Sequence, residues 1–214
     1  MQKQNRIITL SILSLSMLLL SACGAKKPES NTQPTPTVTK LIELTPEEQP
    51  YIKLIPRADG HELKLVIQKL NTNISEIDYE LIYTATDNGQ EIEKGVSGNM
   101  KVEGKSVERD LLLGTASCTN GCKYKYDTGI SQGTLMLTLA TSSGQVSTFE
   151  TPFTLKSAAA LKTEKEIKLP TANFSVKVTP KTGEYYTVIK NALVYSVFSS
   201  NTSNPLVSET PLDN

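Results

Sequence analysis

The feature that most constrains the fold of this chain is an alternation of apolar and polar side chains with a period of two. Apolar residues occupy most of the alternate positions within 63–67, 77–83, 107–113, 135–139 and 149–155. Successive side chains of a β-strand point to opposite faces, so each run predicts a strand with one core face and one solvent face. Short strands separated by turn signals are typical of antiparallel sheets. The sequence therefore predicts an all-β fold, a sandwich or barrel, over residues 51–157.

The segment that follows, 158–200, is predicted to hold a linker and additional β-strands. Residues 157–168 are the best cluster of helix formers and are expected to form a linker or one short helix. Alternation then resumes and continues to about residue 197. These strands either complete the first sandwich or form a small appendage, because about 35 residues are few for an independent core. The polar residues 201–214 are predicted to be a disordered tail.

A proline-rich segment precedes the predicted body. Residues 24–50 contain five prolines, interspersed with Thr, Gln, Ser and Glu. A segment of this composition cannot bury enough apolar surface to fold, and it behaves as an extended spacer. Together with Cys23 it is predicted to form a disordered tether, 23–50.

The first 22 residues have the parts of a secretory signal. Lys3 and Arg6 form a positive start, 7–20 is apolar apart from small hydroxyl residues, and small residues follow. This order is that of a signal peptide, and the apolar stretch is short for a transmembrane helix, which needs ~20 apolar residues. We therefore predict export of the chain, with 1–22 as the signal.

The end of this signal, Leu20-Ser21-Ala22-Cys23, resembles the lipobox of bacterial lipoproteins. The resemblance implies cleavage before Cys23 and a diacylglyceryl group on its thiol, with acyl chains such as palmitate. Two acyl chains are enough for stable anchoring. We therefore expect a chain held outside the cytoplasm, at a cell membrane or outer membrane. The alternative is a signal or anchor in which the Cys occurs by chance.

Cys118 and Cys122 remain once Cys23 is assigned to lipid. They flank Asn120-Gly121, a strong tight-turn signal. In an oxidising compartment such a pair is free to form a disulfide. A metal site is the alternative, although two thiolates supply only half of a tetrahedral zinc shell. We predict a disulfide that pins one turn and, because its loop is short, adds little to stability.

The charge balance argues against a nucleic-acid partner. Without residues 1–22 the chain has 20 basic and 22 acidic side chains, a formal net charge of −2. Binding to nucleic acid requires a concentrated basic surface. We therefore expect the membrane, reached through the lipid, and an envelope protein or glycan as partners.

The motifs of common catalytic and phosphate-binding sites are absent from the sequence. The only histidine, His61, follows an Asp-Gly turn and is expected to face solvent, and Leu65 stands where a zinc-protease motif would place its second histidine. The spacing of loop carboxylates such as Asp87 and Asp127 gives no support to a calcium site. We predict no enzyme activity, no catalytic residue, no metal site and no cofactor. A small hydrolase or metal-dependent enzyme is the weaker alternative.

Tyr124 and Tyr126 are the predicted binding residues. They lie on one face of the strand that leaves the cysteine turn, among Lys123, Lys125 and Asp127. Rigid aromatic rings with charged neighbours can anchor a ligand or a protein partner. The alternative is that the two rings only cover an edge of the sandwich.

The segment 108–139, ERDLLLGTASCTNGCKYKYDTGISQGTLMLTL, resembles uncharacterised immunoglobulin-like domains of lipoproteins from uncultured, small-genome bacteria. The likeness covers about 51–157 and implies an immunoglobulin-like antiparallel β-sandwich, with no activity attached. It departs from antibody domains, which pair cysteines across the sheets beside a Trp. Here the two cysteines are close in sequence and Trp is absent.

These predictions combine into one expected function. We expect a lipid-anchored, non-enzymatic module that binds or assembles with an envelope protein or polymer. A glycan- or peptidoglycan-binding module is the alternative, although the lack of Trp weakens it because sugar platforms use aromatic faces.

Overall fold

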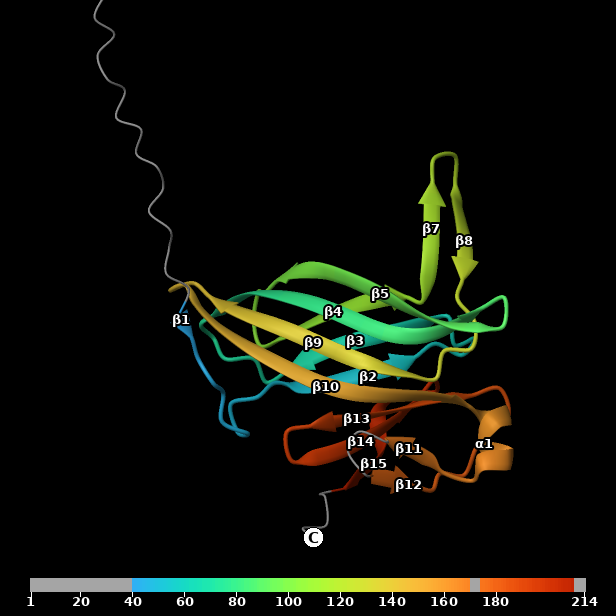
Figure 1. Ribbon diagram of the computed structural model, residues 1–214. Helices are drawn as coiled ribbons and strands as arrows, with labels where there is room; N and C mark the ends of the chain where they lie inside the picture. The colour runs from blue at the N-terminus through green and yellow to red at the C-terminus, as the bar shows by residue number, and fades with distance from the viewer. Residues whose placement is uncertain (1–39, 170–173, 210–214) are drawn as a thin grey trace, which may run out of the picture. The chain divides into compact units, whose positions relative to one another are not determined.

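The computed structural model describes residues 40–169 and 174–209, and these residues belong to one compact unit, Thr37–Asn214 (Figure 1). Within them the chain is all-β apart from one short helix, as predicted. The elements are β1 (Lys40–Leu41), β2 (Tyr51–Pro56), β3 (Glu62–Gln68), β4 (Ile74–Asp87), β5 (Gln90–Lys101), β6 (Ser106–Leu112), β7 (Gly114–Cys118), β8 (Cys122–Tyr126), β9 (Gln132–Thr141), β10 (Gln145–Ser157), α1 (Ala158–Glu164), β11 (Ile167–Leu169), β12 (Phe174–Val176), β13 (Tyr185–Asn191), β14 (Val194–Ser199) and β15 (Thr202–Glu209).

The main sheet has the strand order β15-β14-β13-β10-β9-β4-β5, with every neighbouring pair antiparallel. β1 pairs in parallel with the start of β10, whereas β13 pairs with its end. The long β4–β5 hairpin closes through Asn88 and Gly89, both with positive φ. A two-residue turn of this kind matches the twist of the flanking strands. One edge of this sheet is therefore β5 and the other is β15.

A second sheet, β2-β3-β6, shares a hydrophobic core with β4, β9 and β10 of the main sheet, a β-sandwich-like arrangement. The alternation predicted these core faces correctly. The inward side chains of β3 and β9 are at most 1 % exposed. Each fully buried aliphatic side chain contributes about 1.5–3 kcal/mol relative to an exposed one. The predicted inward residues that are buried are Leu63, Leu65, Ile67, Ile77, Tyr79, Leu81, Tyr83, Leu111, Leu113, Leu135, Leu137, Leu139, Phe149, Phe153 and Leu155.

The strands after α1 extend the main sheet. Alternation predicts one solvent face for each strand, yet β13 and β14 are buried on both faces. Tyr186, Val188 and Val197 pack with α1, β11 and β12 in a second hydrophobic cluster. Ile189 and Phe198 point the other way and join the core that the two sheets share. A layer on each side of one hairpin explains the departure from the predicted pattern.

Side chains of this extension satisfy the free edge of β2. The Asn191 side chain accepts a hydrogen bond from the Ile52 N–H (2.6 Å) and donates one to the Ile52 carbonyl (2.9 Å). The Thr187 hydroxyl donates to the carbonyl of Leu54. Both polar side chains are at most 4 % exposed. They take the place of the neighbouring strand that β2 lacks on this side, and so they attach the extension to the sandwich.

The two ends of the folded unit differ from the predicted boundaries. Residues 40–50, part of the predicted tether, include β1, a buried Pro50, and Leu44 packed against the main core. Residues 202–209, part of the predicted tail, form β15, because the edge of β14 offers backbone partners and Val207 packs on the second cluster. The predicted signal 1–22, Cys23 and the last residues, 210–214, lie outside the described residues. Among those described, no helix is long and apolar enough to cross a membrane.

Candidate binding site at the cysteine hairpin

β7 and β8 form a separate two-stranded hairpin that projects from the sandwich (Figure 1). Its strands pair from Gly114 opposite Tyr126 to Cys118 opposite Cys122, and residues 115–125 are all exposed. The turn predicted at Asn120-Gly121 is present, with Gly121 at φ +91°. An isolated hairpin is marginally stable in water. It therefore depends on covalent closure at its tip and on contacts at its base.

The predicted disulfide closes the tip. Cys118 and Cys122 are bonded, with their Cα atoms 4.1 Å apart. The cross-link holds the two strand ends together where the exposed hairpin has no core to pack against. Because the closed loop is very short, the entropy it removes from the unfolded chain is at the low end for disulfides.

Backbone hydrogen bonds fix the base of the hairpin to the turn between β2 and β3. The Leu113 N–H donates to the His61 carbonyl (2.9 Å), and the Asp127 N–H donates to the Leu113 carbonyl (3.0 Å). The Tyr83 hydroxyl donates to the Asp127 carboxylate (2.8 Å), and Lys94 lies 3.4 Å from the same group. Burial and this carboxylate raise the pKa of Tyr83 well above its usual value. Asp127, considered above as a calcium ligand, is therefore engaged by protein groups.

Tyr124 and Tyr126 lie on one face of β8, as predicted, and their rings stack. The ring centroids are 5.9 Å apart and the planes differ by 5°. His61 also stacks on Tyr126, with centroids 4.0 Å apart and planes 9° apart. We call His61, Tyr126 and Tyr124 the ring stack. Tyr124 at its outer end is 53 % exposed.

The expectation that His61 faces solvent is therefore only partly right. The His61 side chain is 37 % exposed, but one ring face lies against Tyr126. The turn that carries it is built locally: Gly60 has φ +72°, and the Asp59 carboxylate accepts a hydrogen bond from the His61 N–H (3.0 Å). Asp side chains commonly stabilise turns by accepting from the backbone two residues further on.

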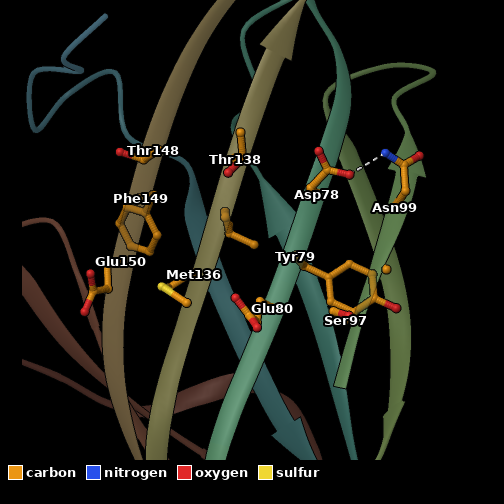
Figure 2. Close-up of a pocket in the computed structure, with 12 residues that line it drawn as sticks. Asp78, Tyr79, Glu80, Ser97, Asn99, Met136, Thr138, Thr148, Phe149 and Glu150 are labelled. Carbon is orange, nitrogen blue, oxygen red and sulfur yellow. Dashed lines mark hydrogen bonds between the residues drawn. The ribbon is translucent and has the colours of Figure 1, made fainter. Parts of the chain in front are cut away.

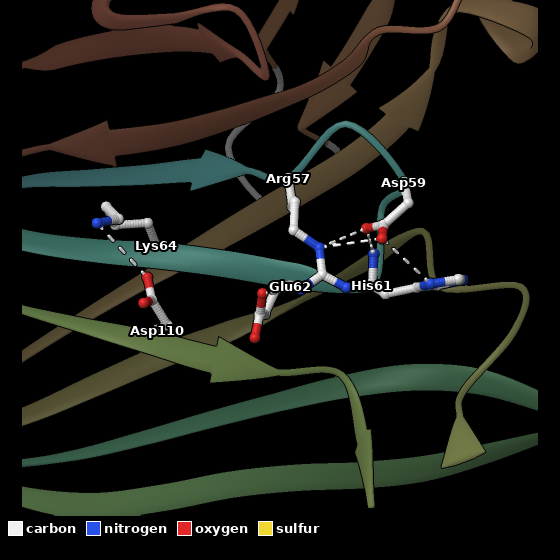
Figure 3. A network of polar contacts seen from close by, with 6 residues as sticks. All are labelled: Arg57, Asp59, His61, Glu62, Lys64 and Asp110. Carbon is white, nitrogen blue, oxygen red and sulfur yellow. Dashed lines mark hydrogen bonds and ion pairs between the residues drawn. The ribbon is translucent and has the colours of Figure 1, made fainter. Parts of the chain in front are cut away.

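A charged network supports the inner end of the ring stack (Figure 3). Arg57 donates from Nε to the Asp59 carboxylate (2.8 Å) and from Nη1 to Glu62. Its guanidinium lies 6.0 Å from the centre of the Tyr126 ring, within the range of a cation–π contact. The hydrogen bond from Arg57 lowers the pKa of Asp59 below its usual value. This network fixes the turn, and the turn places His61 under Tyr126.

A hollow of about 360 Å³ adjoins the ring stack. It lies between the turn at Asp59, the loop that precedes β9, and α1. His61 and Asp127 line it together with Ser131, Ser157 and Tyr185. Within the described residues, no group of three or more His, Cys, Asp and Glu side chains is arranged to hold a metal ion. The predictions that the chain is not an enzyme and carries no metal or cofactor stay predictions.

The comparisons with known proteins found no match. It matches no protein-family model. No curated protein is similar to it at the level that would indicate a relationship. No solved structure matches it either. The resemblance to immunoglobulin-like lipoprotein domains therefore stays a prediction.

Sequence reasoning located part of this site and missed the rest. It found the turn, the disulfide and the face shared by Tyr124 and Tyr126. It missed Arg57 and the stacking of His61, because these residues reach the hairpin only through the pairing of β3 with β6 and the backbone contact at Leu113. The Asp59-Gly60 turn signal was visible, but nothing in the sequence indicates which distant strand lies beside it.

Proposed function

We propose that this chain is a lipid-anchored, extracytoplasmic lipoprotein whose hairpin is a contact element for an envelope protein. The observation that carries the proposal is the hairpin, which presents an exposed Tyr124 between Lys123 and Lys125 on a rigid, cross-linked support. Tyrosine is enriched at the energetic centres of protein interfaces. Lipid attachment at Cys23 rests on the lipobox sequence.

The strand order supports an immunoglobulin-like sandwich. Constant-type immunoglobulin domains have strands A, B, E and D in one sheet and C, F and G in the other. If β2, β3 and β6 are A, B and E, and β4, β9 and β10 are C, F and G, the observed pairings follow that order, without a strand D. The β7–β8 hairpin is then an insertion between E and F. Because its residues are exposed rather than buried in the core, we assign it to binding.

The geometry of the ring stack favours a protein over a glycan. Sugars pack on open aromatic faces, but Tyr126 already stacks with both His61 and Tyr124. Tyr124, at 53 % exposed, is the most exposed residue of the stack. The edges, hydroxyls and flanking ammonium groups suit a protein surface that supplies carboxylates. A glycan- or peptidoglycan-binding module is the second candidate, supported only by the exposed ring of Tyr124.

Lipid attachment can be tested with cysteine variants. The full chain, expressed in a bacterial host, is labelled with a palmitate analogue. We expect labelling that is lost in Cys23→Ser and retained in the matched control, in which Cys118 and Cys122 are replaced together. Equal labelling of Cys23→Ser and the wild type would contradict the proposal.

Partner binding can be tested with residues 37–214, which contain both hydrophobic clusters and every strand of the described residues. This domain is incubated with native envelope and cross-linked through its lysines. We expect cross-links from Lys123 or Lys125 to a protein, weakened about tenfold or more by Tyr124→Ala. Leu193→Ala is the matched control, because Leu193 is equally exposed (56 %) in the β13–β14 turn. Retention on cell-wall polysaccharide alone would favour the glycan candidate.

A further inference from the structure

The outer face of the main sheet, over β5, β4, β9 and β10, contains a hollow of about 760 Å³ (Figure 2). Asp78, Glu80 and Glu150 project into it from three positions, with Met136 between Glu80 and Glu150 in the same register. We call this the outer hollow. Strand pairing fixes the spacing of the Cα atoms that carry these side chains.

The charge of the outer hollow is uncompensated. Glu80 and Glu150 form no ion pair within the described part of the chain, and Asp78 accepts only from the neutral Asn99 side-chain amide (2.7 Å). All three carboxylates are exposed. The net charge of the whole chain is nevertheless zero, so basic groups elsewhere in the chain balance these carboxylates.

The hairpin has the opposite character. Lys123 and Lys125 form no ion pair within residues 40–169 and 174–209, and they flank the exposed Tyr124. Strands of five residues give the hairpin a length of about 16 Å, at 3.3 Å per residue. Its base is fixed by the backbone bonds at Leu113 and by the ring stack. The hairpin therefore has a cationic face and an aromatic face, and its two ammonium groups are not paired with any carboxylate of the described residues.

We infer that the hairpin of one copy docks in the outer hollow of a second copy of this chain. Lys123 and Lys125 alternate with Tyr124 along β8, so their side chains share the opposite face of the hairpin, and on this face two ammonium groups meet three carboxylates. The inference deepens the proposed function: it keeps the hairpin as the contact element and names the envelope partner. Because donor and acceptor surfaces differ, the contact is heterologous, so copies add head to tail into a closed ring or an open chain.

A contact made by one two-stranded hairpin is small, and we expect it to be weak in dilute solution. Interfaces smaller than about 1,200 Å² are typical of transient encounters. Lipid anchoring would confine the copies to one membrane and raise their effective concentration, as linking does for two binding modules. Charge pairs near a surface are screened by salt, so the association should weaken as ionic strength rises.

The test uses purified, oxidised 37–214 and sedimentation equilibrium. Lys123→Glu with Lys125→Glu blocks the hairpin, and Glu80→Gln with Glu150→Gln neutralises the hollow without making it attractive to the variant hairpin. We expect the wild type to associate with increasing concentration at low salt, and each double variant to lose about tenfold or more in association constant. A mixture of the two variants provides the decisive result. The hairpin of the hollow-neutralised copy still fits the hollow of the hairpin-blocked copy, and we expect a one-to-one dimer that cannot grow further.

Three results would overturn the inference. The first is a wild type that stays monomeric at every concentration. The second is association that persists in both double variants. The third is a mixture that sediments as monomers although circular dichroism shows both variants folded. Cross-links from Lys123 to another envelope protein, together with a monomeric wild type, would overturn self-association and leave the proposed function standing.

Discussion

Replacement of Asn191 by Ala should destabilise the whole domain, because this side chain stands in for a missing strand. It bonds both the N–H and the carbonyl of Ile52 and is 4 % exposed. An unsatisfied buried polar group costs about 1–3 kcal/mol, so two groups set a range of about 2–6 kcal/mol. We expect a loss of about 3 kcal/mol in the free energy of unfolding. Domains are stable by only about 5–15 kcal/mol, so the effect is large.

Urea unfolding of residues 37–214, followed by far-ultraviolet circular dichroism, measures this loss. With a slope of about 2 kcal/mol/M, the unfolding midpoint should fall by about 1.5 M urea at unchanged slope. Asn73→Ala is the matched control, because Asn73 is exposed in a loop, and its change should stay within about 0.5 kcal/mol. A loss below about 1 kcal/mol for Asn191→Ala would refute the reasoning, since the edge of β2 would then need no partner.

Three further predictions concern the hairpin, the sheet and the β2–β3 turn. Replacement of Cys118 and Cys122 by Ser should lower the unfolding free energy by no more than about 2 kcal/mol, yet speed amide hydrogen exchange throughout the hairpin. Gly133→Ala should cost about 1–3 kcal/mol in thermal unfolding, because its Cβ would meet a backbone carbonyl of β4 and the ring of Phe153, whereas Gly95→Ala meets nothing closer than 3.5 Å. The pKa of Asp59 is lowered in the folded state from 3.8, so its contribution is present above that pH and is lost as the pH falls through the folded value. Stability measured across the acid range should therefore fall less steeply in Asp59→Asn; equal slopes would contradict the assignment.

Local chemistry made several parts of the candidate site predictable. The Asn120-Gly121 turn, the adjacent cysteines and the alternation along β8 each depend on residues a few positions apart. Together they predict a cross-linked hairpin with Tyr124 and Tyr126 on one face, and the structure has that arrangement. The ring stack could not be predicted, because His61 meets Tyr126 only after three strands have paired. The outer hollow could not be predicted either, because its carboxylates come from β4 and β10, which are far apart in the sequence.

The sequence by itself determined the fold class and the inward face of most strands, because side-chain direction in a strand depends only on the parity of the position. Only the tertiary structure decided that β13 and β14 are covered on both faces, since alternation cannot reveal a second layer. It also decided where the folded unit begins and ends. β1 and β15 lack the alternation of the core strands, and they become strands because β10 and β14 offer them unpaired backbone groups. The role of Asn191 also depends on tertiary structure. A polar side chain of this kind is not expected to be buried from its sequence alone, and it is buried here because it bonds the unpaired backbone groups of Ile52 at the edge of β2.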